Sequence, residues 1–308
     1  MASGKLPSFA FKCVQGLDTG EKKGSGSFGA VYKVTVNGVP CIAKRLHDIL
    51  VNPEVPRRQR ISIKQKFHSE CVMLSQLRHP NVVHFVGVHY GRHEDDISLI
   101  MECLDTDLAR YLESQPNIPI EVKLLILLDV SYGLLYLHTH SPQIIHRDLT
   151  AANILLTRDK RAKIADLGVS KLLDPRTQAA MIQTQAPGTP YYMPPEALKE
   201  NPKYDEKLDI FSFGHLALYV INQDFPEVFE VTITPVMLRE ETLQILKRQK
   251  AIDEMGRDHC LHDIVTKCLQ DNPQKRPTTL ELNERLNHLC VKHPRELQDM
   301  NEVSLKIV

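Results

Sequence analysis

Alternating apolar and polar positions run through the first third of the chain, and this alternation is typical of half-buried strands. Four strands are expected, over 30–36, 39–46, 81–90 and 97–103. Asn37-Gly38 joins the first two, and this dipeptide is the strongest short signal for a tight hairpin. An apolar face with helical spacing predicts one helix over 61–77, between the second and third strands.

From about residue 118 the pattern becomes mostly helical. The segment 121–138 is strongly apolar, and 154–157 with 162–166 indicates a small hairpin across a polar turn. Further helices are expected over 207–221, 237–250, 259–269 and 279–290. The sequence therefore predicts an α+β fold with a small β-rich lobe and a larger α-helical lobe, and a boundary near 102–108.

Composition excludes several classes of protein. The chain has 308 residues, and 38 Lys and Arg balance 38 Asp and Glu, which argues against dedicated binding of nucleic acid or of a membrane surface. Its seven cysteines form no CxxC pair, so we expect free thiols and a cytoplasmic location rather than disulfides or zinc. The start of the chain has no apolar leader, and no apolar run is long enough to span a membrane.

The segment 24–29 reads GSGSFG, a glycine pattern that is weak by itself. A dinucleotide-binding enzyme would need a helix directly after Gly29, whereas an alternating, strand-like segment follows. We therefore expect a glycine-rich hairpin whose N–H groups can approach phosphate oxygens. The turn at Asn37-Gly38 would bring the chain back beneath it and place Lys44 near the same phosphates.

One acidic residue lies on the apolar face of the expected helix 61–77. Glu70 is three or four residues from Phe67 and Leu74, which share that face. A carboxylate that points inward needs a cationic partner, because burying it alone is costly. Lys44 is the natural candidate, and the alternative is that Glu70 lies at the edge of the face and reaches water.

The segments IIHRDLTAANILL (144–156) and AKIADLG (162–168) carry most of the candidate chemistry. Asp148 and Asn153 lie in a loop, and Asp166 ends the next strand. Oxygen-bearing side chains on adjoining turns suit Mg²⁺ and a hydroxyl group that must lose its proton.

The ordered set of these motifs resembles the eukaryotic protein kinase family, and it is closest to the tyrosine-kinase-like and tyrosine kinase group. The resemblance runs from about Gly24 to Arg276 and includes GTPYYMPPE (188–196) and DIFSFG (209–214). It implies the bilobal protein kinase fold, with a kinase domain over 14–292. Within that domain it implies an N-lobe over 14–101, a hinge over 102–108 and a C-lobe over 109–292, flanked by an extension (1–13) and a tail (293–308).

The resemblance also implies ATP and Mg²⁺ as cofactors and assigns roles to individual residues. Lys44, fixed by Glu70, would hold the phosphates, Asp148 would take or orient the acceptor proton, and Asn153 and Asp166 would bind the metal. Glu196 and Arg276 would form a buried pair in the C-lobe. The residues that would contact the nucleotide are Gly24, Ser25, Gly26, Ser27, Phe28, Gly29, Val31, Ile42, Lys44, Met101, Glu102, Leu104 and Leu155.

The resemblance implies an enzyme of intracellular signalling that phosphorylates a protein substrate. Thr150 and Ala152 stand where Ser/Thr and tyrosine kinases, respectively, usually carry a cation, whereas Thr189 in GTPYYMPPE resembles the Ser/Thr form. We therefore expect transfer to Ser and Thr, with tyrosine or dual specificity as the alternative. An upstream kinase or autophosphorylation would act on the polar segment before Glu196, with Thr184 favoured. A pseudokinase that only binds nucleotide is a less favoured alternative.

Overall fold

The computed structural model describes the chain as two compact units. The strand unit comprises Met1–Leu104 and Asp166–Ala179, and the helix unit comprises Asp105–Ala165 and Ala180–Val308. The described residues are 10–11, 14, 22–26, 29–45, 56, 58, 60–61, 65, 71–72, 74–90, 97–167, 194–198, 205–223 and 248–292.

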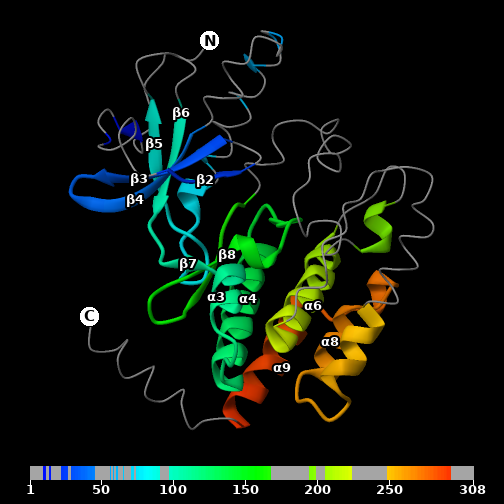
Figure 1. The fold of residues 1–308 in the computed structure, drawn as a ribbon. Helices are drawn as coiled ribbons and strands as arrows, with labels where there is room; N and C mark the ends of the chain where they lie inside the picture. Colours follow the sequence, from blue (N-terminus) through cyan, green and yellow to red (C-terminus); the bar gives the residue numbers. More distant parts are fainter. Residues whose placement is uncertain are drawn as a thin grey trace. The chain divides into compact units, whose positions relative to one another are not determined.

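The strand unit is built on a six-stranded sheet with the order β1-β5-β6-β4-β3-β2. Its strands are β1 (Ala10–Phe11), β2 (Lys22–Gly26), β3 (Gly29–Val36), β4 (Val39–Arg45), β5 (Phe85–Tyr90) and β6 (Ile97–Glu102) (Figure 1). All neighbours pair antiparallel except β1 and β5, which are parallel. Asn37 and Gly38 both have positive φ, 51° and 83°, so the predicted β3–β4 hairpin is confirmed with the turn chemistry that its sequence indicates.

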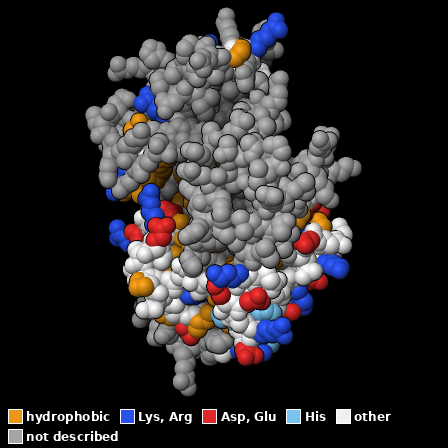
Figure 2. Space-filling model, turned by 45° about the vertical axis from the view of Figure 1, so that its right-hand side comes forward, with side chains coloured by type: hydrophobic (Ala, Val, Ile, Leu, Met, Phe, Trp, Pro, Cys, Tyr) orange, Lys and Arg blue, Asp and Glu red, His pale blue; other side chains and the backbone are white. Residues whose placement is uncertain are grey.

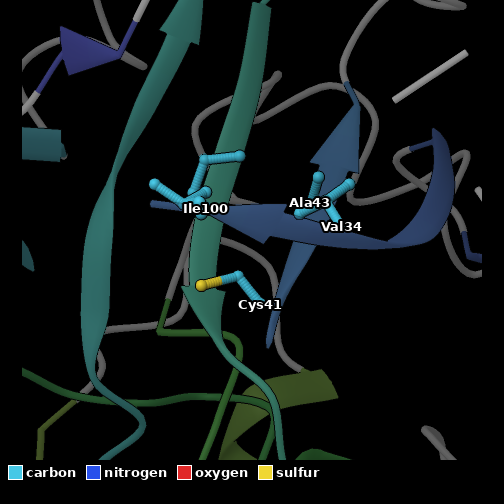
Figure 3. Packing of buried hydrophobic residues seen from close by; sticks show 5 residues of the cluster. Val34, Cys41, Ala43 and Ile100 are labelled. Carbon is cyan, nitrogen blue, oxygen red and sulfur yellow. The ribbon is translucent and has the colours of Figure 1, made fainter. Parts of the chain in front are cut away.

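A small apolar cluster fixes the register of this sheet. Its buried members are Val34, Val36, Cys41, Ala43 and Ile100, which come from β3, β4 and β6 (Figure 3). Because side chains alternate between the two faces of a strand, a one-residue slip would expose this whole set. The cluster therefore also fixes the position of every polar residue on β4.

Two segments of the strand unit differ from the sequence expectation or are described only in part. The strand expected over 81–90 begins only at Phe85, because a turn precedes it in which Val82 N–H donates to His79 O and Asn81 N–H to His79 Nδ1. Within the expected helix 61–77, residues 61, 65, 71–72 and 74–76 are helical, and the remainder up to 73 lies outside the described residues.

The helix unit contains α-helices, five of them with both ends described, and a three-stranded sheet of order β7-β8-β9. The helices are α3 (Leu108–Ser114), α4 (Ile120–Thr139), α6 (Lys207–Asn222), α8 (His262–Cys268) and α9 (Thr279–Lys292), and the strands are β7 (Thr106–Asp107), β8 (Ile154–Leu156) and β9 (Ala162–Ile164) (Figure 1). Three short 3₁₀ turns are also described: η1 (Ala151–Asn153), η4 (Pro195–Leu198) and η5 (Pro273–Lys275). The predicted helices over 121–138, 207–221 and 279–290 and the hairpin of 154–157 and 162–166 are confirmed.

Helix α4 is the centre of this unit, since it packs against α6, α9 and β9. Its apolar residues are buried on nearly all sides, which explains why its sequence is apolar throughout rather than along one stripe. Helix α6 is buried from Lys207 to Val220 and packs closely against α8. A Cβ added to Gly214 of α6 would lie 2.8 Å from Leu269 Cγ, so this contact requires glycine.

Local hydrogen bonds decide where two of the later helices begin. The helix expected from 259 starts only at His262, because His259 Nδ1 accepts the N–H of Leu261 and holds a turn there. Helix α9 begins with a capping box: Glu281 N–H donates to Thr278 Oγ1, and Thr278 N–H donates to Glu281 Oε2. Of the helix expected over 237–250, only 248–250 are described, and they belong to a helical segment over 248–255.

The predicted pair Glu196–Arg276 is confirmed. Arg276 Nη1 lies 2.5 Å from Glu196 Oε1 and Nη2 lies 2.9 Å from Oε2, so the pair is bidentate. The guanidinium also stacks on Phe211 of α6, 4.7 Å from the ring centre. Because the side chain of Arg276 is fully buried, this pair ties η4 and η5 to α6.

The described surface carries both signs of charge, and Lys, Arg, Asp and Glu side chains lie interspersed on the face shown in Figure 2. Among the described helices, none is both long enough and apolar enough to cross a membrane.

Candidate active site

Lys44 is the central polar residue of the strand unit. It lies on β4 opposite Val31 of β3 and Leu99 of β6, and it is only 6% exposed. Its Nζ lies 2.5 Å from Oδ1 of Asp166, whose side chain is 30% exposed. The structure therefore brings two of the predicted site residues together, a buried ammonium and a carboxylate that remains open to solvent.

The glycine segment lies two strands from Lys44. Gly24 pairs with Val31, and Val31 pairs with Lys44, so the three residues form one row across β2, β3 and β4. At the usual strand spacing this places the Gly24 backbone about 10 Å from that of Lys44. Residues 24–26 belong to strand β2, a strand that sequence reasoning missed because Lys23 stands where an aliphatic residue would mark it. Ser27 and Phe28 lie outside the described residues.

The end of β6 carries three further predicted residues. Met101 is half-buried and lies opposite Ile42 of β4, which places the two candidate adenine contacts on neighbouring strands. Glu102 N–H donates to His84 O at 3.0 Å, and His84 N–H donates to Glu102 Oε1 at 2.7 Å. The N–H of Glu102 is thus bonded to His84, and the contacts of the Glu102 carbonyl and the Leu104 backbone with a base stay predictions.

Glu70 lies outside the described residues, so its pairing with Lys44 stays a prediction. Leu155 belongs to the helix unit, where it lies half-buried on β8 opposite Lys163 of β9.

In the helix unit, the 146–153 loop holds Asp148 and Asn153 together. Asn153 Nδ2 donates to the carbonyl oxygen of Asp148 at 2.8 Å and to its Oδ2 at 3.2 Å. The backbone of Asn153 is fixed as well, since its N–H donates to Thr150 O and its carbonyl accepts Ala165 N–H. Within the described part of the chain, Asn153 Oδ1 accepts no hydrogen bond, so its lone pairs can serve a cation.

His146 orients the same loop from inside. Its Nδ1 accepts Asp148 N–H at 3.2 Å, so in the neutral ring Nε2 carries the proton and donates to Ala165 O at 2.8 Å. His146 is almost completely buried. It therefore links Asp148 to the end of β9, directly before Asp166.

The loop is anchored on Asp209 of α6, a residue that the sequence analysis did not single out. Its Oδ2 accepts His146 N–H at 2.8 Å, and its Oδ1 accepts Arg147 N–H at 2.7 Å. Burial by itself would raise the pKa of Asp209, but the hydrogen bond from His138, the nearby histidines and the Arg147 amide outweigh burial, and the pKa lies below 3.8. The available signal was an acidic residue, in DIFSFG, at the start of an otherwise apolar helix.

Two site positions have unusual backbone conformations. Arg147 has φ 66° and Asp166 has φ 61°, a left-handed region that residues other than glycine rarely adopt. Such conformations cost of order 1–3 kcal/mol each and persist where surrounding contacts enforce them, often at functional sites. For Arg147 the enforcing contact is the bond from its N–H to Asp209.

Each unit carries residue types that suit a nucleotide or Mg²⁺. Mg²⁺ is usually held by one or two carboxylates together with substrate phosphates and water, rather than by a cage of protein ligands. No group of three or more His, Cys, Asp or Glu that could hold a metal ion occurs among the described residues. Asp166 and Asn153 each offer a suitable oxygen, and Lys44 offers a phosphate a buried positive charge.

Comparison with known proteins agrees with this geometry. The protein kinase domain family matches residues 17–289. The chain is 30% identical over 275 residues to the dual specificity protein kinase shkE of Dictyostelium discoideum, covering 86% of this chain and 35% of shkE. It is 30% identical over 315 residues to the LysM domain receptor-like kinase 10 of Oryza sativa subsp. japonica (94% and 48%). It is 32% identical over 274 residues to the calcium/calmodulin-regulated receptor-like kinase 2 of Arabidopsis thaliana (85% and 58%). The chain thus spans between about a third and three fifths of these relatives.

Proposed function

This chain belongs to the protein kinase domain family, and from that premise we propose that it transfers the γ-phosphate of ATP to Ser and Thr hydroxyls of proteins. The bilobal α+β fold and the protein kinase family that the motifs predicted are confirmed. The limits 14–292 for the domain stay a prediction beside the matched range 17–289.

The observation that carries the proposal is the ion pair between Lys44 and Asp166. A buried lysine paired with a half-exposed carboxylate suits a site that must neutralise phosphate and hold a cation. When bound, Mg²⁺ would neutralise charge on the phosphates. Lys44 would hold the phosphates, Asp166 and Asn153 would hold the metal, and the glycine segment would approach the phosphates with its backbone.

Asp148 has the role of the proton acceptor in this proposal. Asn153 Nδ2 donates to Oδ2 of Asp148, and within the described residues Oδ1 of Asp148 accepts no hydrogen bond. One carboxylate oxygen is thus held while the other can orient and deprotonate an acceptor hydroxyl. Little covalent chemistry is required of the protein, since positioning and charge stabilisation supply most of the rate in phosphoryl transfer.

The preference for Ser and Thr is argued from the relatives and from the residues of the 146–153 loop. Relatives include probable serine/threonine kinases, such as SIS8 of Arabidopsis thaliana, and dual specificity kinases. Thr150 and Ala152 of the 146–153 loop carry no charge, so neither position supplies a cation to the phosphate. Thr189 and Thr184 lie outside the described residues. A reducing, cytoplasmic location is part of the proposal and rests on the sequence alone, whose seven cysteines form no CxxC pair.

Labelled ATP and arrays of Ser, Thr and Tyr peptides, followed by phosphoamino-acid analysis, test the proposal. We expect phosphoserine and phosphothreonine from the wild type and neither from Asp148→Asn. Thr150→Lys should transfer phosphate to a Ser peptide faster than the wild type, because the lysine adds a positive charge near the phosphate. Phosphotyrosine alone would overturn the Ser/Thr assignment. Nucleotide binding without transfer to any peptide would favour a pseudokinase.

A further inference from the structure

A buried chain of hydrogen bonds joins the start of α9 to the 146–153 loop. Thr279 Oγ1 lies 2.6 Å from His138 Nδ1, and His138 Nε2 lies 2.8 Å from Asp209 Oδ2. The same carboxylate accepts the N–H groups of His146 and Arg147. Helix α9 is thereby connected, through α4 and α6, to the backbone next to Asp148.

Burial makes each link depend on the next. Thr279 is 4% exposed, His138 8% and Asp209 0%, so solvent water cannot replace a missing hydrogen-bond partner. In such surroundings an unsatisfied polar atom is costly, and neighbouring hydrogen bonds strengthen one another. The position of the Asp209 carboxylate therefore depends on the orientation of the His138 ring, and the ring has only one described hydrogen-bond partner on its other side, Thr279.

The donors and acceptors along this chain are fixed by chemistry. Asp209 is ionised, since its pKa lies below the ordinary value, so His138 Nε2 must carry a proton and donate to it. The hydroxyl of Thr279 suits Nδ1 in both charge states of the ring. It donates to the lone pair of a neutral ring and accepts from the N–H of a charged one.

We propose that Thr279 is a positioning residue for phosphoryl transfer. Its hydroxyl orients the His138 ring, and that ring in turn orients the carboxylate of Asp209. The Asp209 carboxylate then holds the backbone next to Asp148. This proposal deepens the proposed function and rests on it. No other side-chain hydroxyl contacts His138 in the described part of the chain.

The neighbouring Thr278 offers a matched control. Its hydroxyl caps the same helix through Glu281, but that cap is exposed and takes no part in the chain to Asp209. Thr278→Val and Thr279→Val each remove one hydroxyl from adjacent residues and keep nearly the same shape. A purely structural role for the start of α9 predicts similar losses of melting temperature and similar kinetics for both variants.

The first experiment does not depend on activity. Amide hydrogen exchange of His146 and Arg147, followed by NMR on the whole chain, reports whether Asp209 still holds the loop. We expect about tenfold faster exchange at both amides in Thr279→Val and wild-type rates in Thr278→Val and Thr279→Ser. Unchanged exchange in Thr279→Val overturns the inference. If Thr279→Val does not fold, ring ¹⁵N shifts of His138 in the wild type decide, and a ring with no hydrogen bond at Nδ1 overturns it.

The second experiment separates positioning from stability. In steady-state assays with a protein substrate, we expect kcat of Thr279→Val to fall by about tenfold, with KM for ATP unchanged, because a small displacement of a catalytic group costs turnover rather than nucleotide binding. Thr279→Ser should restore kcat. Equal kcat for Thr278→Val and Thr279→Val overturns the inference. If exchange changes as expected but the wild type transfers no phosphate, the hydrogen-bond chain stands and the proposed function fails.

Discussion

The strand unit and the helix unit hold their candidate catalytic residues by different means. Lys44 sits in a strand whose position is set by backbone pairing with β3 and β6 and by an apolar cluster that does not include the Lys44 side chain. Asp148 sits in a loop whose backbone is held by side-chain hydrogen bonds, in particular those of the buried Asp209 carboxylate and the buried His146 ring. A strand can therefore lose its functional side chain without moving, whereas the loop depends on residues that do no chemistry themselves.

The largest effects are expected at the chemical groups. Lys44→Met, Asp148→Asn and Asp166→Asn should each lower kcat/KM by about 10³-fold, because each removes a charge aimed at phosphate, acceptor or metal. Lys44→Met should keep the melting temperature of the wild type, since the ladder around β4 does not use its side chain. Circular dichroism during heating checks this, and near-normal turnover in any of the three variants would show that its assigned role is wrong.

Asp209→Asn tests whether the 146–153 loop of the helix unit depends on the Asp209 carboxylate. It should lower the free energy of unfolding by about 3 kcal/mol, the usual scale for disrupting a buried charged network, and lower kcat as well. Asp129→Asn is the matched control, because Asp129 is about equally buried and accepts from Arg161 and Ala162, and none of its described hydrogen bonds goes to the 146–153 loop. Urea unfolding should show a similar loss for both variants. A similar loss of kcat in Asp129→Asn would contradict the special role of Asp209.

A smaller effect tests the packing beneath Asp209. Gly214→Ala should cost about 1–3 kcal/mol, since the new Cβ would overlap Leu269 and Cys268 and push α6 from α8. Adding Leu269→Ala makes room, so the double variant should be less destabilised than the sum of the two single variants. Strict additivity in urea unfolding would mean that the two residues do not meet as described.

The smallest expected effect is a pH dependence that resides in the helix unit. Burial, with a further contribution from Arg248, lowers the pKa of His215 well below 6.5. Below pH 6.5 the unfolded chain binds a proton that the folded chain refuses, so the free energy of unfolding should fall by about 1 kcal/mol between pH 7 and 5.5. In His215→Leu this part of the slope should disappear, while His288→Leu on the exposed face of α9 keeps it. Parallel slopes for wild type and His215→Leu would rule out this residue as the cause.

Much of the fold was predictable because it rests on local signals. Asn37-Gly38 fixed the β3–β4 hairpin, and the apolar segments over 121–138 and 207–221 became α4 and α6. The errors occurred where a short-range hydrogen bond overrides periodicity. Helix α8 begins later than expected because of His259, and β5 begins later because of the turn after His79. Helix α3 was missed, since its seven residues are too few to show a period.

The sequence by itself determined the protein family and the chemical groups, because ordered motifs carry both Lys44 and the 146–153 loop. It could not determine that the Asp166 carboxylate lies against Lys44. The pairing of Lys44 with Glu70 stays a prediction. Nor could the sequence assign Asp209 or Thr279, which lie 61 and 131 positions after Asp148 by their numbering. The hydrogen bonds from Thr279 to His138 and from His138 to Asp209 join segments far apart in the chain. They form only once α4, α6 and α9 have packed together and excluded water.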